Sequence, residues 1–190
     1  MKDNNEKLTT LGAWNKELSE YKIPKWEDLP EIDLYMDQVV SIIEKCLGIY
    51  SGISVNKTIT PSIINNYVKL GIIPPPVKKK YSRTHIAYLI IICILKQVLP
   101  IASIQALIIL QEQIYPINQI FNQFCDIYEK TTVETLNNSK LESLLSVNPD
   151  DQTLYKLALT MSNQANASKM LSEKIIWMDK SIIDEHTQRS

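Results

Sequence analysis

An uninterrupted apolar run at residues 86–95, IAYLIIICIL, is the feature that most limits how this chain can fold. A spanning helix needs roughly 20 apolar residues, and Lys96, Gln97 and Pro100 interrupt this run well before that length. A helix that is apolar on every side must instead be buried in a protein core. We therefore expect a fully buried helix, then an amphipathic helix over residues 101–113, and no membrane association.

The composition predicts an all-α (mainly α) protein with a real core. The chain has 190 residues, of which 45% are hydrophobic and only 4 are glycine. This is enough apolar material for one large domain or two small ones, and it excludes disorder over the whole length. Few glycines for tight hairpins and long stretches of helical periodicity favour helices. A net charge of -1 argues against coating nucleic acid by bulk charge, so any DNA contact must be local.

Cysteine usage and the N-terminus both indicate a protein that stays inside the cell. Cys46, Cys93 and Cys125 are odd in number, widely spaced and embedded among apolar residues, which is typical of reduced core cysteines. The first residues, MKDNNEKLTTLGAW, have no apolar stretch behind their lysines and do not form a signal peptide. We therefore expect a cytoplasmic protein.

Three regions are expected along the chain. Residues 1–12 are polar and are predicted to be loose, a short helix is expected over residues 11–21, and Trp14 and Trp26 would pin this segment to the body. We predict an N-terminal arm at 1–30, a winged helix-turn-helix domain at 31–113, and a helical dimerisation or sensing region at 114–190. The helix-turn-helix itself is expected between about Met36 and Leu110.

The first helix of this motif is predicted over residues 34–47, where apolar residues recur at helical spacing and Gly48 follows as a stop. Asp33 and Asp37 lie one turn apart there, with Glu44 two turns further on, and a carboxylate cluster can carry acid-base or metal chemistry. No histidine or second cluster accompanies them. Acidic residues favoured at a helix N-terminus by the macrodipole are the better interpretation.

The second helix is predicted over residues 61–70 and is the candidate recognition helix. Thr60 is an N-cap residue type, Pro61 suits the first helical position, and Gly71 can close the helix in a left-handed turn. At helical spacing one side should be buried and the other polar and free of acids. Buried positions are Ile63, Ile64, Tyr67, Val68 and Leu70, and exposed positions are Ser62, Asn65, Asn66 and Lys69. Asn can pair bidentately with adenine, and Lys can reach guanine or phosphate.

A basic wing is predicted over residues 78–83, directly after this helix. Three prolines at 74–76 force an extended path, and the densest basic cluster follows, with Lys78, Lys79, Lys80 and Arg83 around Tyr81. The simpler explanation of this cluster is a run of charges exposed to solvent. The position of the cluster beside the recognition helix nevertheless favours contact with the sugar-phosphate backbone. Ser82 is predicted to be the N-cap of the apolar helix that follows, and His85 is the third residue of that helix.

Residues 60–110 resemble the winged helix-turn-helix of mercury-resistance (MerR) type bacterial regulators. The matching residues are Thr60, Tyr67, Gly71, Ile72, Ile73, Pro74, Tyr81 and Ser82. The segments LPEIDLYMDQVV, INNYVKLGIIPPPVKKKYSRTHI and LKQVLPI also resemble a bacterial family described only as a domain of unknown function, over about residues 26–128. These resemblances imply a winged helix-turn-helix fold and a regulatory role.

The chain departs from the MerR pattern where base preference is set. Asn65 and Asn66 stand where the arginine and first tyrosine of the recognition helix are expected, and the lysine run replaces a glycine-arginine wing tip. Base preferences therefore do not transfer. MerR effector domains often offer cysteines or a hydrophobic drug pocket, and no such site is matched residue by residue. A small-molecule effector of unknown identity stays open.

The C-terminal part is expected to be helical and to include the dimer contact. An amphipathic helix is predicted over residues 116–130, residues 137–151 look like a helix edge or linker, and a long helix is predicted from Asp151. Its apolar residues fit heptad-like positions: Leu154, Leu157, Met161, Leu171, Ile175, Met178 and Ile182. The polar middle, residues 163–167, leaves two readings open, packing on its own chain or the seam of a homodimer.

Enzyme chemistry is not expected. The sequence has no glycine-rich phosphate loop, no CxxC or HExxH, and no serine or cysteine with a credible base nearby. We predict no cofactor and no metal. The expected function is a transcriptional regulator that binds double-stranded DNA as a homodimer, through Thr60, Ser62, Asn65, Asn66, Lys69, Lys78, Lys79, Lys80, Tyr81 and Arg83. The alternative is a helical protein-interaction module with a degenerate winged helix.

Overall fold

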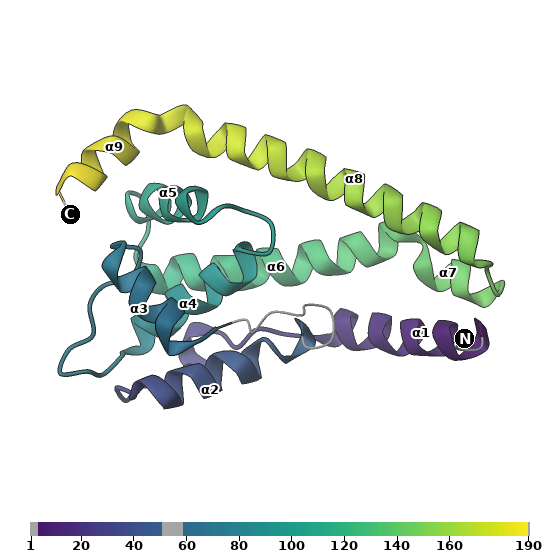
Figure 1. Cartoon of the computed structure of the whole chain (residues 1–190), viewed down its shortest axis with the longest axis horizontal. Helices are drawn as coiled ribbons and strands as arrows, with labels where there is room; N and C mark the ends of the chain where they lie inside the picture. The colour runs from purple at the N-terminus through teal and green to yellow at the C-terminus, as the bar shows by residue number, and fades with distance from the viewer. Residues whose placement is uncertain (1–3, 51–58, 190) are drawn as a thin grey trace. The chain divides into compact units, whose positions relative to one another are not determined.

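The structure, a computed structural model, describes residues 4–50 and 59–189. This part of the chain is mostly helical, as predicted (Figure 1). The helices are α1 (Asn4–Glu20), α2 (Met36–Cys46), α3 (Pro61–Lys69), α4 (Arg83–Leu95), α5 (Ile101–Glu112), α6 (Ile117–Ser139), α7 (Leu141–Ser146), α8 (Asp151–Ile176) and α9 (Lys180–Arg189). Short 3-10 turns lie at Trp26–Asp28, Gly48–Tyr50 and Trp177–Asp179.

The chain divides into two compact units. Unit 1 comprises Met1–Lys22 and Asp126–Ser168, and unit 2 comprises Ile23–Cys125 and Lys169–Ser190. These limits differ from the expected boundaries after residues 30 and 113, because α6 and α8 each run from one unit into the other. Unit 2 contains the predicted helix-turn-helix segment.

The core of unit 2 is built around α4, as the apolar run predicts. Every residue from His85 to Ile94 is buried, and α2 and α5 pack against this helix. In the middle of α4 the Tyr88 hydroxyl donates a hydrogen bond to the carboxylate of Glu112, the last residue of α5. No helix in the described ranges is both long enough and apolar enough to cross a membrane. Burial of α4 therefore fixes the places of α2, α5 and, through α2, α3.

The predicted limits of the two motif helices are confirmed to within two residues. Thr60 caps α3 by accepting a hydrogen bond from the backbone N–H of Ile63 at 3.3 Å, and Gly71 follows with φ 66°. Only glycine adopts this left-handed conformation without strain. Part of the connection between α2 and α3 lies outside the described residues.

The prediction that Leu70 is buried is wrong, since half of its surface is exposed. It lies only about 40° around an ideal helix from Asn66, at the edge of the polar side, and it follows the last helical residue. Ile72 and Ile73, just beyond the turn, fill the core in its place. Of the other positions predicted to be buried, Ile64 and Tyr67 are buried and Ile63 and Val68 are half-buried. The predicted polar side is confirmed, since Ser62, Asn65, Asn66 and Lys69 are exposed.

The prediction of a loose segment over residues 1–12 is wrong for the described part, because α1 already begins at Asn4. The sparse apolar residues of this segment give a weak helical signal. Packing within unit 1 decides the structure: α1 lies against α7, with Leu8 and Leu141 buried, and Lys7 pairs with Asp151 at 3.1 Å.

The C-terminal helices begin near the predicted places but end elsewhere: α6 runs further, and α8 stops at Ile176, before the predicted heptad positions Met178 and Ile182. The helix predicted over residues 116–130 continues as α6 to Ser139, and the expected linker contains α7. The long helix begins at Asp151 as predicted, and Asp150 caps it by accepting the backbone N–H of Thr153 at 2.8 Å. Hydrogen bonds from Thr153 hold the pKa of the Asp150 carboxyl below its usual value.

All three cysteines lie within helices, and no disulfide joins them. Cys93 on α4 and Cys125 on α6 are buried, and Cys46 is half-buried. Burial raises the pKa of the Cys93 thiol to about 11 and also raises that of Cys46. Thiols in this state are poor nucleophiles, as expected for structural core cysteines.

A buried histidine forms the start of α4. The backbone N–H of Ser82 donates to His85 Nδ1 at 3.0 Å, and the Ser82 hydroxyl lies 2.9 Å from the same nitrogen. Burial lowers the pKa of His85 from its ordinary value of 6.5, opposed by the backbone carbonyls of Pro75 and Pro74 and by the charge of Asp33. His85 therefore stays neutral at physiological pH.

This depressed pKa predicts that the protein loses stability in mild acid. Below pH 6.5 the unfolded chain binds a proton that the folded chain resists, so the free energy of unfolding falls as the pH drops toward the folded pKa. Urea unfolding at pH 7.5 and pH 5.0 measures this slope. The variant His85→Gln, which keeps a capping-box residue at this position, should unfold with a shallower pH dependence. Identical pH dependence in the two proteins would contradict a lowered pKa for His85. The variant His186→Gln measures how much the other histidine contributes to the pH dependence.

Candidate nucleic-acid interface

The polar face of α3 (Ser62, Asn65, Asn66 and Lys69) is exposed along the whole helix. The opposite side holds α3 in place: Ile64 and Tyr67 are buried, and burial raises the pKa of the Tyr67 hydroxyl to about 12. The helix is also held to α5 by Gln105, whose side-chain amide donates to the Leu70 carbonyl at 3.4 Å. Asn65 and Asn66 thus project from a helix whose position is fixed by its buried side.

A tight turn follows, which we name the lysine hairpin (residues 77–80). Val77 and Lys80 exchange two backbone hydrogen bonds of 3.1 and 2.9 Å, and the two residues between them, Lys78 and Lys79, have φ values of 50° and 63°. Positive φ at both central positions defines a type I′ turn, which strongly prefers Asn-Gly. A left-handed conformation costs roughly 1–2 kcal/mol for each residue with a side chain. Two exposed lysines therefore occupy the tip despite a conformational cost.

The base of the lysine hairpin is tied to the segment before α2. Tyr81 and Leu34 exchange backbone hydrogen bonds of 2.8 and 2.9 Å. The Tyr81 ring is buried and meets His85 edge-on, with 5.3 Å between ring centroids. Lys80 Nζ lies over the Tyr35 ring, 5.2 Å from its centroid. Tyr81, expected at the interface, thus lies where it supports the hairpin.

Arg83 is less available for contact with a ligand than the lysines of the hairpin are. Its guanidinium lies 5.6 Å from the centroid of the Trp26 ring and 3.3 Å from Glu31, and only 18% of its side chain is exposed. Trp26 is itself held by its backbone N–H, which donates to Asn122 on α6 at 2.8 Å. Arg83 therefore joins the start of α4 to the segment before α2. Thr60 is half-buried, with its hydroxyl occupied as the cap of α3.

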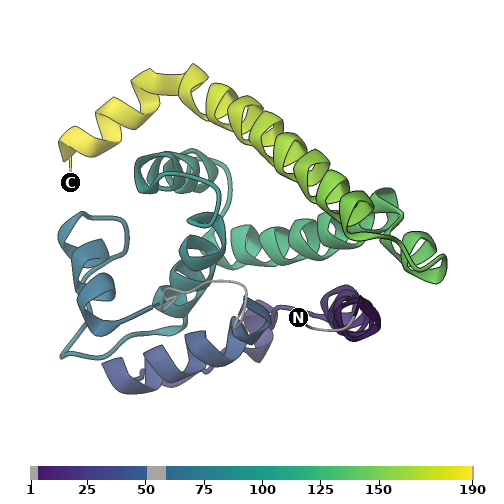
Figure 2. The same ribbon diagram turned by 45° about the vertical axis from the view of Figure 1, so that its right-hand side comes forward.

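The structure brings two groups of the expected residues to one part of unit 2. Only residues 70–76 separate α3 from the lysine hairpin, and both lie at the left edge in Figures 1 and 2. The exposed members are Ser62, Asn65, Asn66, Lys69, Lys78 and Lys79, with Lys80 half-exposed. Amide, hydroxyl and ammonium groups of this kind can meet base edges and phosphates.

One electrostatic signal in the sequence was missed by the motif analysis. Residues 45–111 contain eight Lys or Arg and no Asp or Glu, although the whole chain has 20 basic and 21 acidic residues. The segment holds α3, the lysine hairpin, α4 and nearly all of α5. Counting charges along the chain would have found it. Glu31 and Asp33, at the base of the hairpin, partly oppose this excess of positive charge.

Apolar residues also border this surface, although no motif in the sequence predicts them there. Ile32 and Tyr35 before α2, Leu70 at the end of α3, and Val77 in the lysine hairpin are all exposed large hydrophobic residues. Scattered apolar residues are normal on a protein surface. Because four of them lie on connected segments of unit 2, this surface is also suited to contact with another protein.

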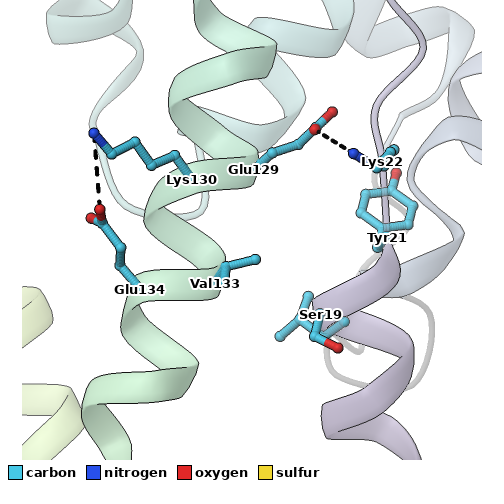
Figure 3. Close-up of a pocket in the computed structure, with 8 residues that line it drawn as sticks. Ser19, Tyr21, Lys22, Glu129, Lys130, Val133 and Glu134 are labelled. Carbon is cyan, nitrogen blue, oxygen red and sulfur yellow. Dashed lines mark hydrogen bonds and ion pairs between the residues drawn. The ribbon is translucent and has the colours of Figure 1, made fainter.

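A second possible ligand site, in unit 1, has little unpaired charge. It is a hollow of about 420 Å³ between the end of α1 and α6 (Figure 3). Lys22 pairs with Glu129 at 3.1 Å, and Lys130 reaches Glu134 at 4.0 Å. Its charged side chains thus neutralise one another. The described residues also contain no cluster of three or more His, Cys, Asp or Glu that could hold a metal ion.

Comparison with known proteins places the chain in a family without defining an activity. Residues 24–131 match the family described as "Domain of unknown function (DUF1836)". No curated protein and no solved structure matches the chain. The matched region includes α2, α3, the lysine hairpin, α4 and α5, and so contains the whole candidate interface. More than half of the sequence is covered, and the chain belongs to the DUF1836 family.

Proposed function

We propose that this protein is a transcriptional regulator that binds double-stranded DNA through a MerR-like winged helix-turn-helix. One observation carries the proposal. The acid-free polar face of α3 stands next to a hairpin whose two tip lysines are held in the left-handed conformation. Strained positions of this kind persist where the surrounding structure enforces them, and they are enriched at functional sites.

In the proposed complex α3 enters the major groove and the lysine hairpin meets the backbone. Asn65 and Asn66 would pair with adenine edges, and Lys69 would reach guanine or phosphate. Lys78 and Lys79 would neutralise phosphates, which gives affinity without sequence preference. Arg83 and Tyr81 would act indirectly, by supporting the hairpin. As a regulator that reads a two-fold operator, the protein would act as a homodimer.

A protein-interaction module is the second candidate function. The exposed apolar residues around the same surface, Ile32, Tyr35, Leu70 and Val77, favour it. Enrichment of apolar and aromatic side chains is characteristic of the centre of protein interfaces. The two candidates differ in their response to salt.

Titration of the protein with a fluorescent random-sequence duplex separates them. DNA binding through phosphates gives a logarithm of affinity that falls linearly with the logarithm of salt concentration, by about 0.9 for each phosphate neutralised. We expect a steep linear fall between 50 and 200 mM salt, roughly the range in which such contacts weaken strongly. No binding at the lowest salt would reject the proposed function and leave the protein-interaction module.

A hairpin variant should become more stable and bind DNA less well. Lys78→Asn with Lys79→Gly gives the sequence that a type I′ turn prefers, so it should raise the free energy of unfolding by about 1 kcal/mol or more. The same change removes two ammonium groups and should flatten the salt slope by up to about two units. Urea unfolding and the duplex titration measure the two effects.

Lys140 supplies the matched control for the hairpin variant. It also has a positive φ, 55°, but lies at the N-cap of α7 in unit 1. Lys140→Asn should relieve similar strain and remove one charge without changing the salt slope. An unaltered slope in the hairpin variant, together with normal circular dichroism, would remove Lys78 and Lys79 from the interface.

The two sides of α3 predict opposite phenotypes. Asn65→Ala or Asn66→Ala should change the free energy of unfolding by less than about 0.5 kcal/mol, because both side chains are exposed. Each should weaken binding to the preferred site, once that site is selected from random oligonucleotides, by about 1–3 kcal/mol, with little loss on other DNA.

Tyr67→Ala tests the buried side of the same helix. It should destabilise the fold by about 3–5 kcal/mol, because a large ring leaves the core. Asparagine variants that unfold, or that bind every sequence as the parent does, would be incompatible with a base-reading face on α3.

A further inference from the structure

Unit 1 contains a second hollow, which we name the polar hollow. It has a volume of about 340 Å³ and lies among the second half of α1, the end of α6 and the start of α7. Its lining residues are Asn15, Ser19, Val133, Leu136, Asn137, Lys140, Glu142 and Ser143, of which Ser19 and Val133 also border the hollow in Figure 3. All of them belong to unit 1, so the polar hollow is formed within one compact unit.

The side-chain amide of Asn15 is the first feature that indicates a ligand. Asn15 is half-buried, and its Oδ1 atom is buried without a hydrogen-bond partner among the described residues. Buried polar atoms are nearly always hydrogen-bonded, because leaving one unpaired lowers the stability of the fold. The last side-chain torsion of asparagine is broad, so the amide can turn its oxygen toward a donor in the polar hollow. The amide therefore favours a ligand that donates hydrogen bonds.

Two charged side chains of the polar hollow are also unpaired. Lys140 and Glu142 are exposed, and neither forms an ion pair with a residue in the described ranges. In the hollow of Figure 3, by contrast, Lys22 pairs with Glu129. Lys140 also has a φ of 55°, a left-handed conformation that is costly for a residue with a side chain. A cation and an anion that do not neutralise each other can bind the two opposite charges of one ligand.

The size and polarity of the polar hollow restrict the ligand further. Its volume lies at the lower end of the range for small-molecule sites, roughly 300–1,000 Å³, so the ligand must be small. Apart from Val133 and Leu136, every lining residue carries an amide, a hydroxyl or a charge. A sugar would satisfy the amides and hydroxyls but would leave both charges without a partner. A small zwitterion with a polar side chain satisfies all of these groups.

We propose that the polar hollow binds a free amino acid with a polar side chain. The acceptors Asn15 and Glu142 would bind its ammonium group, and Lys140 would bind its carboxylate. The side chain of the ligand would contact the remaining amide and hydroxyl groups of the lining. This ligand-binding function belongs to unit 1, and it goes beyond the proposed function, which concerns a surface of unit 2.

Isothermal titration calorimetry of the full chain tests the class of ligand. The probes are glutamine, asparagine, serine and threonine, with leucine and glucose as comparisons. We expect at least one of the four polar amino acids to bind with a dissociation constant below about 1 mM, and more tightly than leucine or glucose. Its N-acetyl and carboxamide derivatives each lack one charge and should bind at least about tenfold more weakly. Weaker binding of all four probes, tighter binding of leucine or glucose, or equal binding of the derivatives would overturn the proposal.

Substitution of the two charged residues tests the site itself. Lys140→Asn relieves the left-handed strain, so it should not lower stability, yet it should weaken binding of the best probe at least about tenfold. Glu142→Gln keeps the shape of the side chain and should weaken binding to a similar extent. The control variants Lys156→Asn and Glu17→Gln remove the same charges from exposed positions of unit 1 that do not line the polar hollow. They should leave the dissociation constant unchanged, and equal effects at the lining and control positions would overturn the proposal.

Asn15→Leu tests the buried amide. It replaces an unpaired polar group with an apolar group of similar size, so the free energy of unfolding without ligand, measured in urea, should not fall. The same variant should bind the best probe at least about tenfold more weakly. A fall in stability or unchanged binding would overturn the assignment of Asn15 to the site. Because these experiments contain no DNA, a chain that binds amino acids but not DNA would reject the proposed function alone, and the reverse result would reject the polar hollow alone.

Discussion

The burial of α4 is the constraint on which the rest of unit 2 depends. A helix that is apolar on every side has no solvent face, so neighbouring elements must cover it from several directions. Helices α2 and α5 do so, and α2 in turn supports α3. At its start, α4 is capped by Ser82 and His85, next to the bonds that join Tyr81 to Leu34. The same helix end thus organises both the core and the hairpin.

The sequence predicted those elements whose signals are local. Thr60, Pro61 and Gly71 mark the limits of α3, because capping and left-handed turns depend on single residues. A helix over residues 11–21 was predicted, but the start of α1 at Asn4 was missed, because its few apolar residues become informative only when α7 packs on them. Leu70 was misplaced because it lies only about 40° around the helix from exposed Asn66, at the edge of the polar side.

The candidate site was predictable as a set of residues but not as an arrangement. The sequence placed Arg83 and Tyr81 with the lysines, since all are neighbours in the chain. Their contacts with Trp26, Glu31 and Leu34 involve a segment about fifty residues earlier, and no periodicity reports such pairings. Likewise, type I′ geometry at Lys78 and Lys79 could not be predicted, because lysine is an unfavourable residue for that turn.

The chain passes between the two units at three places, after residues 22, 125 and 168, and the last two lie inside α6 and α8. Each unit is therefore built from two separate segments of the chain, and no single contiguous stretch of the gene encodes a whole unit. Recombination that transplanted residues 23–125 alone would leave behind α9, which covers α5. A chimera that carries either unit must therefore include all the segments of that unit.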